Sequence, residues 1–384
     1  MPRVLLCLVG LIFAQPQPTA AQTAPAASQG PPAAAQAPPA HALLADPDGE
    51  PIVVGSIHRI RSSVYGNEQT ITVRLPRGYG DAPDRRYPVL FSVDGGPDQD
   101  FELLAGIAAE AEHSTSYEPF ILIGIKTEDR YSQLTPEMTR LPIARLRENF
   151  GERMKPGGAV TFREYLERDV IPWATGRYRT GRKILTAASL GGLFVLDTFL
   201  QRPEMFDDYI ALTPSVWWDD GRVVDAAARA LARHGRSDRR FYFTMGDEGV
   251  GNRSGAWLDA LVRTFRTNAP PGLKWAFVDR SGSEEHRTMA LISWLDAMRT
   301  LYLTPSRTGS PLSLIYPGFR RPEYTAEVRA NLATPACTRA NAVPLTFAEK
   351  NRRVAELYGM CVLMRPGAEI TAGNFEPADF GRRD

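Results

Sequence analysis

Residues 184–201, which read ILTAASLGGLFVLDTFLQ, carry the strongest structural signal in the chain. Residues 184–187 are a short apolar run that fits a buried strand, and residues 190–201 form an apolar segment of helix length. Ser189 stands between them, with small residues two positions before and two positions after it. A sharp turn between a strand and a helix needs neighbours of this kind, because the two elements must approach closely. The stretch therefore predicts a strand, a tight turn that carries a serine, and a helix.

Short apolar runs alternate with helix-length segments on both sides of Ser189. The runs that predict strands are 69–75, 88–93, 120–125, 184–187, 209–212, 241–245 and 275–278. The segments that predict helices are 101–112, 162–174, 190–201, 223–233, 257–266 and 288–301. Several of the runs are continuously apolar, as expected for strands that are covered on both faces. This alternation predicts an α/β fold with a mostly parallel central sheet flanked by helices. Residues 59–64 and 69–75, around Tyr65-Gly66-Asn67, predict an antiparallel hairpin at one edge.

A serine nucleophile needs a base, which is usually a histidine. In a sheet of this kind, ligands bind beyond the carboxyl ends of the strands. Of the five histidines, only His286 follows a predicted strand and a short polar loop and then opens a helix. The others stand elsewhere, at His41, His58, His113 and His234. His286 is therefore the candidate base.

The acid that orients the base should lie between the serine and the histidine in chain order. Asp247 and Glu248 directly follow the predicted strand 241–245. We favour Glu248 because its longer side chain reaches further from a loop, and Asp279 is a third option. The order Ser189, Glu248, His286 then places one member of a triad at each of three strand ends.

An oxyanion hole needs two N–H donors. Leu190, directly after the serine, supplies one, because the N-terminus of a helix has amides without intrahelical acceptors. For the second we favour Gly95, with Gly96 as the alternative, in the turn after strand 88–93. An ordinary glycine turn explains this segment nearly as well.

Three further side chains are candidates for substrate binding. Trp217 and Trp218 follow the predicted strand 209–212, where they either wall a pocket for the acyl or aryl group or pack in the core. Arg130 lies in the loop after strand 120–125, at the same edge of the sheet.

Several segments together resemble the esterase D-like branch of the α/β-hydrolases, which includes ferric-siderophore trilactone esterases. They read YPVLFSVDG (87–95), DRYSQLTP (129–136), IP (171–172), RYR (177–179), ASLGG (188–192), TPSVWWDD (213–220), GDEG (246–249) and EEH (284–286). The resemblance covers residues 55–303. It implies the α/β-hydrolase fold and a serine carboxylic-ester hydrolase that works through an acyl-enzyme, with Ser189, Glu248 and His286 as nucleophile, acid and base. Ala187 stands where many members of the family have glycine, which is a mild departure, and Arg287-Thr288 stand where a Gly-Ser pair is common. The second departure bears on the expected substrate preference more than on the expected activity.

The two ends of the chain differ from this central part. Residues 1–21 have a positive start, an apolar run too short to span a bilayer and the small residues Thr19-Ala20-Ala21, so they predict a cleaved signal peptide. Residues 22–44 are rich in Ala, Pro and Gln and predict a disordered spacer before a catalytic domain at 45–303. We therefore expect a periplasmic or secreted protein with no membrane span after cleavage. In the C-terminal extension, 304–384, Cys337 and Cys361 form either a disulfide or two buried thiols.

Composition narrows the function further. The 384 residues include 45 Lys and Arg against 44 Asp and Glu, so no overall positive charge attracts nucleic acid. The sequence has no motif for a metal, nucleotide or dinucleotide site, and we expect no cofactor. We predict an exported serine esterase whose partner is a small-molecule ester. The alternatives are transfer of the acyl group to an acceptor other than water, and a binding protein that uses the hydrolase scaffold without catalysis.

Overall fold

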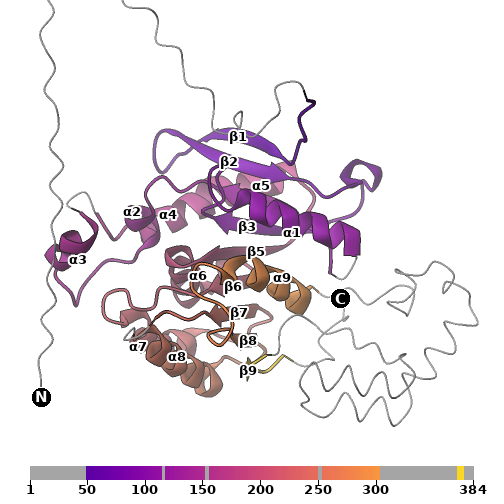
Figure 1. Ribbon diagram of the computed structural model, residues 1–384. Coiled ribbons are helices and arrows are strands. Elements are labelled where there is room, and N and C mark those ends of the chain that lie inside the picture. The colour runs from indigo at the N-terminus through magenta and orange to yellow at the C-terminus, as the bar shows by residue number, and fades with distance from the viewer. Residues whose placement is uncertain (1–48, 115–116, 152–154, 250–252, 303–369, 376–384) are drawn as a thin grey trace, which may run out of the picture. The chain divides into compact units, whose positions relative to one another are not determined.

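The computed structural model describes residues 49–114, 117–151, 155–249, 253–302 and 370–375 (Figure 1). The predicted signal peptide 1–21, the spacer segment 22–44 and the cysteines Cys337 and Cys361 lie outside the described residues. In the described ranges, no helix combines the length and the apolar character that crossing a membrane requires.

A mixed sheet forms the centre of the fold. Within the described residues it has the strand order β1-β2-β4-β3-β5-β6-β7-β8-β9. The strands are β1 (Ser56–Arg61), β2 (Glu68–Arg74), β3 (Tyr87–Val93), β4 (Ile121–Ile125), β5 (Thr180–Ala188), β6 (Asp208–Leu212), β7 (Arg240–Met245), β8 (Lys274–Asp279) and β9 (Ala372–Gly373). The strands from β4 to β8 in this order are parallel, whereas β1, β2 and β9 run antiparallel to their neighbours. The predicted α/β class and the antiparallel hairpin at one edge are confirmed.

Helices cover both faces of the sheet (Figure 1). One face packs against α1 (Phe101–Ser114) and α9 (Met289–Leu301). The other packs against α4 (Ala159–Tyr165), α5 (Ile171–Arg177), α6 (Leu190–Gln201), α7 (Arg222–Arg233) and α8 (Ser254–Asn268). Each predicted helix is present. The two short helices α2 (Arg130–Leu134) and α3 (Ile143–Phe150) are not among the predicted elements, because neither is long enough to show a clear apolar period.

The predicted helix at 162–174 is interrupted. A π-helical turn (Leu166–Val170) separates α4 from α5. Pro172, which has no N–H to donate, stands at the start of α5, directly after this turn. A local change of helical pitch near a proline is a common way to satisfy the remaining backbone groups.

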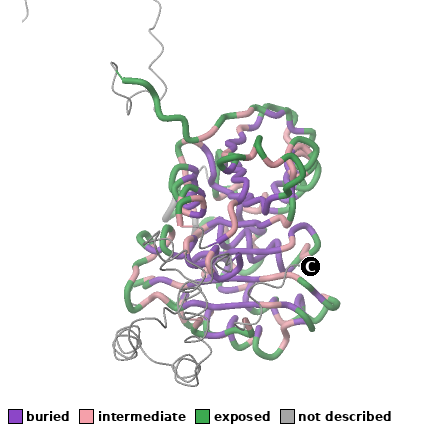
Figure 2. The backbone as a smooth tube through the Cα atoms, turned by 90° about the vertical axis from the view of Figure 1, so that its right-hand side faces the viewer, coloured by how far each residue is buried: buried purple, intermediate pink, exposed green. Residues whose placement is uncertain are grey.

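Burial explains why α6 shows no polar stripe. Every residue from Leu190 to Leu200 is buried, because the helix lies between the sheet and the neighbouring helices of its layer. Strand β3 is likewise buried along its whole length. Figure 2 shows buried residues running along the strands and exposed residues on the outer turns. The β5–α6 connection therefore leads into a helix that is buried from Leu190 to Leu200.

Strand β9 comes from the predicted C-terminal extension. The Thr371 N–H donates to Phe277 O at 2.9 Å, and the Asn374 N–H donates to Trp275 O at 3.1 Å. The Asn374 side chain adds bonds to β8, accepting from Trp275 N at 2.8 Å and donating to Leu273 O at 2.9 Å. Residues 370–375 thus belong to the same sheet as the predicted catalytic domain.

Candidate active site

Ser189 occupies a strained turn between β5 and α6. Its φ of 61° and ψ of −122° are unusual for a residue with a side chain. Backbone hydrogen bonds hold it there: Ser189 N–H donates to Leu212 O at 3.0 Å, and Leu193 N–H donates to Ser189 O at 2.9 Å. The turn directs the serine away from the sheet at the carboxyl end of β5.

The two glycines after Leu190 are required by close packing. A Cβ atom on Gly191 would lie 2.5 Å from the Cβ of Ala187. A Cβ atom on Gly192 would lie 2.6 Å from the carbonyl oxygen of Leu212 at the end of β6. The helix can begin this close to both strands only because these positions lack side chains.

The three predicted triad residues meet at this edge. His286 Nε2 lies 3.0 Å from Ser189 Oγ, and His286 Nδ1 lies 2.8 Å from Glu248 Oε1. Since an ionised carboxylate accepts but does not donate, Nδ1 carries the proton and Nε2 can accept one from the serine. The imidazole side chain is 31% exposed, whereas Glu248 is 12% exposed. The base therefore has access to solvent while its carboxylate partner is sheltered.

Backbone bonds join the loop that carries the acid to the loop that carries the base. Asp247 N–H donates to Glu284 O at 2.8 Å, and His286 N–H donates to Asp247 O at 3.1 Å. The Asp247 carboxylate turns back to accept from Gly249 N–H at 2.9 Å. The Asp279 carboxylate accepts from the backbone and hydroxyl of Ser281. Of the three acids weighed from the sequence, the structure brings Glu248 to the imidazole.

The predicted oxyanion donors need one correction. Leu190 opens α6, so its N–H has no intrahelical acceptor and lies next to the serine. The Gly95 N–H, by contrast, donates to the carbonyl oxygen of Ile125, the last residue of β4, at 3.0 Å. It is therefore already bonded to the sheet. Gly95 is a glycine because a Cβ atom would lie 2.4 Å from Gly124 Cα. The Gly96 N–H donates only to a side chain, Gln99 Oε1, at 2.9 Å.

Arg130 links the turn after β3 to the residue before the nucleophile. Its Nε donates to Asp94 Oδ2 at 2.9 Å, and its Nη2 lies 3.4 Å from Ala188 O. The Arg130 side chain is 42% exposed, so part of its charge remains open to a ligand. Burial raises the pKa of Asp94, and burial together with the Asp94 charge raises the pKa of Asp100 to about 6. In the described residues, no three His, Cys, Asp or Glu side chains converge as they would around a metal ion.

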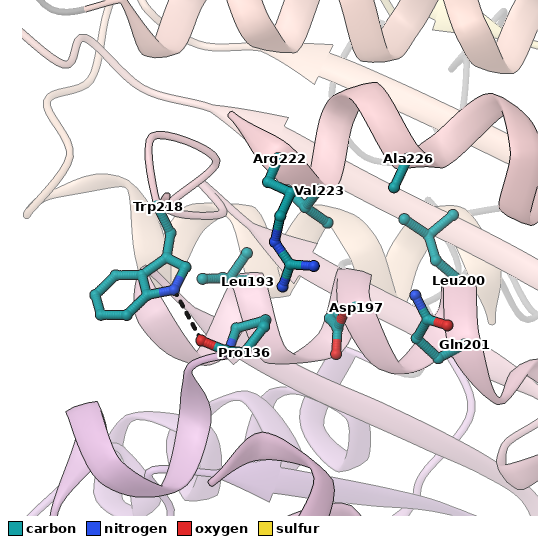
Figure 3. A pocket seen from close by; sticks show the side chains of 9 residues that line it. All are labelled: Pro136, Leu193, Asp197, Leu200, Gln201, Trp218, Arg222, Val223 and Ala226. Atoms are coloured by element: carbon teal, nitrogen blue, oxygen red, sulfur yellow. Dashed lines mark hydrogen bonds between the residues drawn. The ribbon is translucent and has the colours of Figure 1, made fainter. Parts of the chain in front are cut away.

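The two tryptophans have different environments. Trp218 is 2% exposed, and its indole N–H donates to Pro136 O at 3.0 Å (Figure 3). Together with Leu193 from α6 and Val223 from α7, it lines a small pocket of about 30 Å³. Trp218 is therefore a core residue, the second of the two alternatives that the sequence left open for it. Trp217 is half-buried, with its ring 5.8 Å from that of Trp218.

Comparisons with known proteins agree with this fold. Residues 62–269 match the family described as "Putative esterase". The chain belongs to this family. The esterase is 32% identical to ferri-bacillibactin esterase BesA of Bacillus subtilis (strain 168) over 182 residues, which cover 44% of the esterase and 61% of that relative. The match thus spans about three fifths of the relative's length.

Solved structures show the same α/β-hydrolase fold. An IroE-like serine hydrolase from Shewanella oneidensis has a TM-score of 0.55 and 20% identity, covering 82% of the esterase and 90% of that chain. The BES protein from Bacillus cereus has a TM-score of 0.57 and 21% identity, covering 68% of the esterase and 100% of that chain. At these identities the similarity establishes the fold alone.

Replacing Gly192 by alanine tests whether close packing requires a glycine there, because alanine otherwise favours a helix over glycine. Gly192→Ala should destabilise the esterase by about 2 kcal/mol or more, because the new methyl group overlaps Leu212 O. Gly106→Ala is the matched control, since Gly106 lies on an exposed position of α1 with open space around it, and it should stabilise by about 0.5–1 kcal/mol. Denaturant unfolding measures both. Equal effects of the two substitutions would contradict the packing argument.

The pKa of Asp100 makes stability depend on pH. Because its folded-state pKa of about 6 lies above the unfolded value, the folded state binds the proton more tightly, and this contribution to stability falls as pH rises from about 4 to 6. Asp100→Asn should therefore raise the free energy of unfolding by about 2 kcal/mol at pH 7.5 and have little effect at pH 4. Denaturant unfolding at the two pH values measures this. A variant no more stable than wild type at pH 7.5 would refute it.

Proposed function

We propose that this esterase hydrolyses carboxylic esters through an acyl-enzyme formed on Ser189. One observation carries the proposal: the uninterrupted hydrogen-bonded path from Ser189 Oγ through the His286 ring to Glu248 Oε1. Its nucleophile–base and base–acid distances suit proton transfer without rearrangement. The assignment of nucleophile, base and acid to these three residues is part of the proposal.

The reaction divides into two steps. Ser189 Oγ bonds to the ester carbonyl carbon while its proton passes to His286 Nε2. The tetrahedral intermediate then collapses, the bond to the alcohol oxygen breaks, and the imidazolium returns the proton to that oxygen. Water then attacks the acyl carbon, with His286 as the base that takes its proton. The bond from that carbon to Ser189 Oγ breaks, the imidazolium returns the proton to Oγ, and the carboxylic acid product is released. Glu248 fixes the imidazole tautomer and stabilises its charged form throughout.

The oxyanion of each tetrahedral intermediate would bind at the start of α6. The Leu190 N–H points from the positive end of a buried helix, which favours negative charge. The Gly96 N–H is the better second donor, because its acceptor is a side chain, Gln99 Oε1, and not a strand carbonyl. A substrate oxygen that takes this N–H would compete with a side chain that is also bonded to the Thr127 backbone. This choice replaces Gly95, whose amide the sheet uses.

The substrate class follows from the relatives and from local charge. A matched relative is named for the ester bonds of a ferric siderophore, ferri-bacillibactin. We infer that siderophore-type or other small esters are substrates. The partly exposed Arg130 guanidinium beside Ala188 would attract an anionic group near the serine. Trp217, half-buried next to Trp218, would offer an aromatic surface.

The N-terminal sequence supports a location outside the cytoplasm. A positive start, a short apolar run and small residues before position 22 are the marks of an export signal. We therefore place the enzyme in the periplasm or in the medium, where ester siderophores and other small esters would reach it.

Ser189→Ala tests the nucleophile directly. On short p-nitrophenyl esters and a trilactone siderophore, the variant should lose about 10⁴-fold in kcat/KM, because no other group forms the acyl-enzyme. Its melting temperature should remain that of wild type. Ser56→Ala, on the exposed edge strand β1, is the control and should keep full activity. Wild-type turnover by Ser189→Ala would refute the proposal, and product analysis with added alcohols separates hydrolysis from acyl transfer.

A further inference from the structure

The turn Thr213-Pro214-Ser215, which follows β6, lies between the two ends of the candidate triad. Its backbone is bound to the serine turn, since Ser189 N–H donates to Leu212 O at 3.0 Å and Ser215 N–H donates to Ser189 O at 3.1 Å. The missing side chain of Gly192 allows this approach, because a Cβ atom there would lie 3.1 Å from Pro214 Cα. Any shift of this turn would therefore move the nucleophile.

Thr213 has an unusual backbone conformation. Its φ of 37° lies in the left-handed region, which a β-branched residue rarely adopts. The residue is 1% exposed, and its N–H donates to Thr244 Oγ1 on β7 at 3.3 Å. Strain of this kind persists only where the surroundings hold it, and it concentrates at functional sites.

The Thr213 hydroxyl contacts both the acid and the base. Its O–H donates to Glu248 Oε1, the same oxygen that accepts from His286. Its oxygen also lies 3.3 Å from His286 Nδ1. Because the hydroxyl proton is directed to the carboxylate, only lone pairs face Nδ1, and they favour the tautomer with a proton on that nitrogen. This is the tautomer that leaves Nε2 free to accept from Ser189.

The Ser215 hydroxyl lies at the other end of the path. It is buried, 3% exposed, and its Oγ is 3.4 Å from Ser189 Oγ. When Ser189 donates to His286, the Ser215 O–H can donate to the nucleophile oxygen. That bond would fix the Ser189 rotamer and stabilise negative charge as the proton leaves.

We propose that Thr213 and Ser215 are positioning residues: Thr213 holds Glu248 and the reactive tautomer of His286, and Ser215 orients Ser189. One short turn thus sets the geometry of all three triad members. This inference rests on the proposed esterase function.

Thr213→Val and Thr213→Ser form a matched pair for the test. Valine keeps the β-branched shape and loses the hydroxyl, whereas serine keeps the hydroxyl. Thr213→Val should lower kcat for a p-nitrophenyl ester about 10- to 100-fold with KM unchanged, the usual effect of losing a group that orients a catalytic residue. Thr213→Ser should recover most of the activity. Ser215→Ala should lower kcat about 10-fold.

The pH profile separates positioning from a structural role. In Thr213→Val, Glu248 loses the bond from the Thr213 hydroxyl and stabilises the imidazolium less, so the acid limb of kcat/KM should move to lower pH. The downfield proton NMR signal of His286 Nδ1–H, assigned with His286→Ala, should weaken or shift in this variant without substrate present. Thr213→Ser should resemble wild type in both measurements.

Two results would overturn the inference. The first is that Thr213→Val keeps the wild-type kcat, the wild-type acid limb of kcat/KM and the wild-type NMR signal of His286 Nδ1–H. The second is that Thr213→Val loses kcat only to the extent that its melting temperature falls, while its pH profile and its NMR signal stay those of wild type. If wild type itself shows no hydrolysis that depends on Ser189, the proposed function fails instead, and the NMR comparison still decides the role of Thr213.

Discussion

The close contact between the first turn of α6 and the ends of β5 and β6 is the constraint on which the site depends. It allows Ser189 to adopt its strained conformation and brings the start of a helix, with its unpaired amides, next to the hydroxyl. Gly191 and Gly192 make the contact possible, and the buried length of α6 holds it in place. Strain at one residue is sustained here by the packing of a whole helix.

The parallel sheet then brings the other two members of the proposed triad to the same edge. Glu248 and His286 follow β7 and β8, and these strands end at the same edge as β5. The backbone bonds of Asp247 with Glu284 and with His286 join the two loops. The Glu248 side chain reaches from this loop to the imidazole, whereas the shorter Asp247 side chain accepts a hydrogen bond from Gly249 N–H within the loop. Once the close contact at the start of α6 fixes the serine, the register of β5, β6, β7 and β8 brings the other two side chains to it.

Much of this could be predicted from the sequence, because it depends on local pattern and chain order. The continuously apolar segment after Ser189 predicted α6 with the ends that the structure has. The chain order of residues that follow strands predicted that they would meet at one edge of the sheet. Apart from those between the three predicted triad residues, contacts between distant segments could not be predicted in this way. The pairing of β3 with β4 uses the Gly95 amide, and the packing of α6 against α7 buries Trp218. The positions of Thr213 and Ser215 depend likewise on contacts across strands, and β9 (Ala372–Gly373) is too short to carry a strand signal.

Covalent labelling by a fluorophosphonate tests the central claim most directly, because the probe reacts only with a serine that a neighbouring base activates. The esterase should take up one equivalent, and peptide mass analysis should place it on Ser189. Labelling should be lost in His286→Ala and slowed in Glu248→Gln, in line with the path from Ser189 to Glu248. An unlabelled wild-type protein, or an adduct on a different residue, would contradict the account.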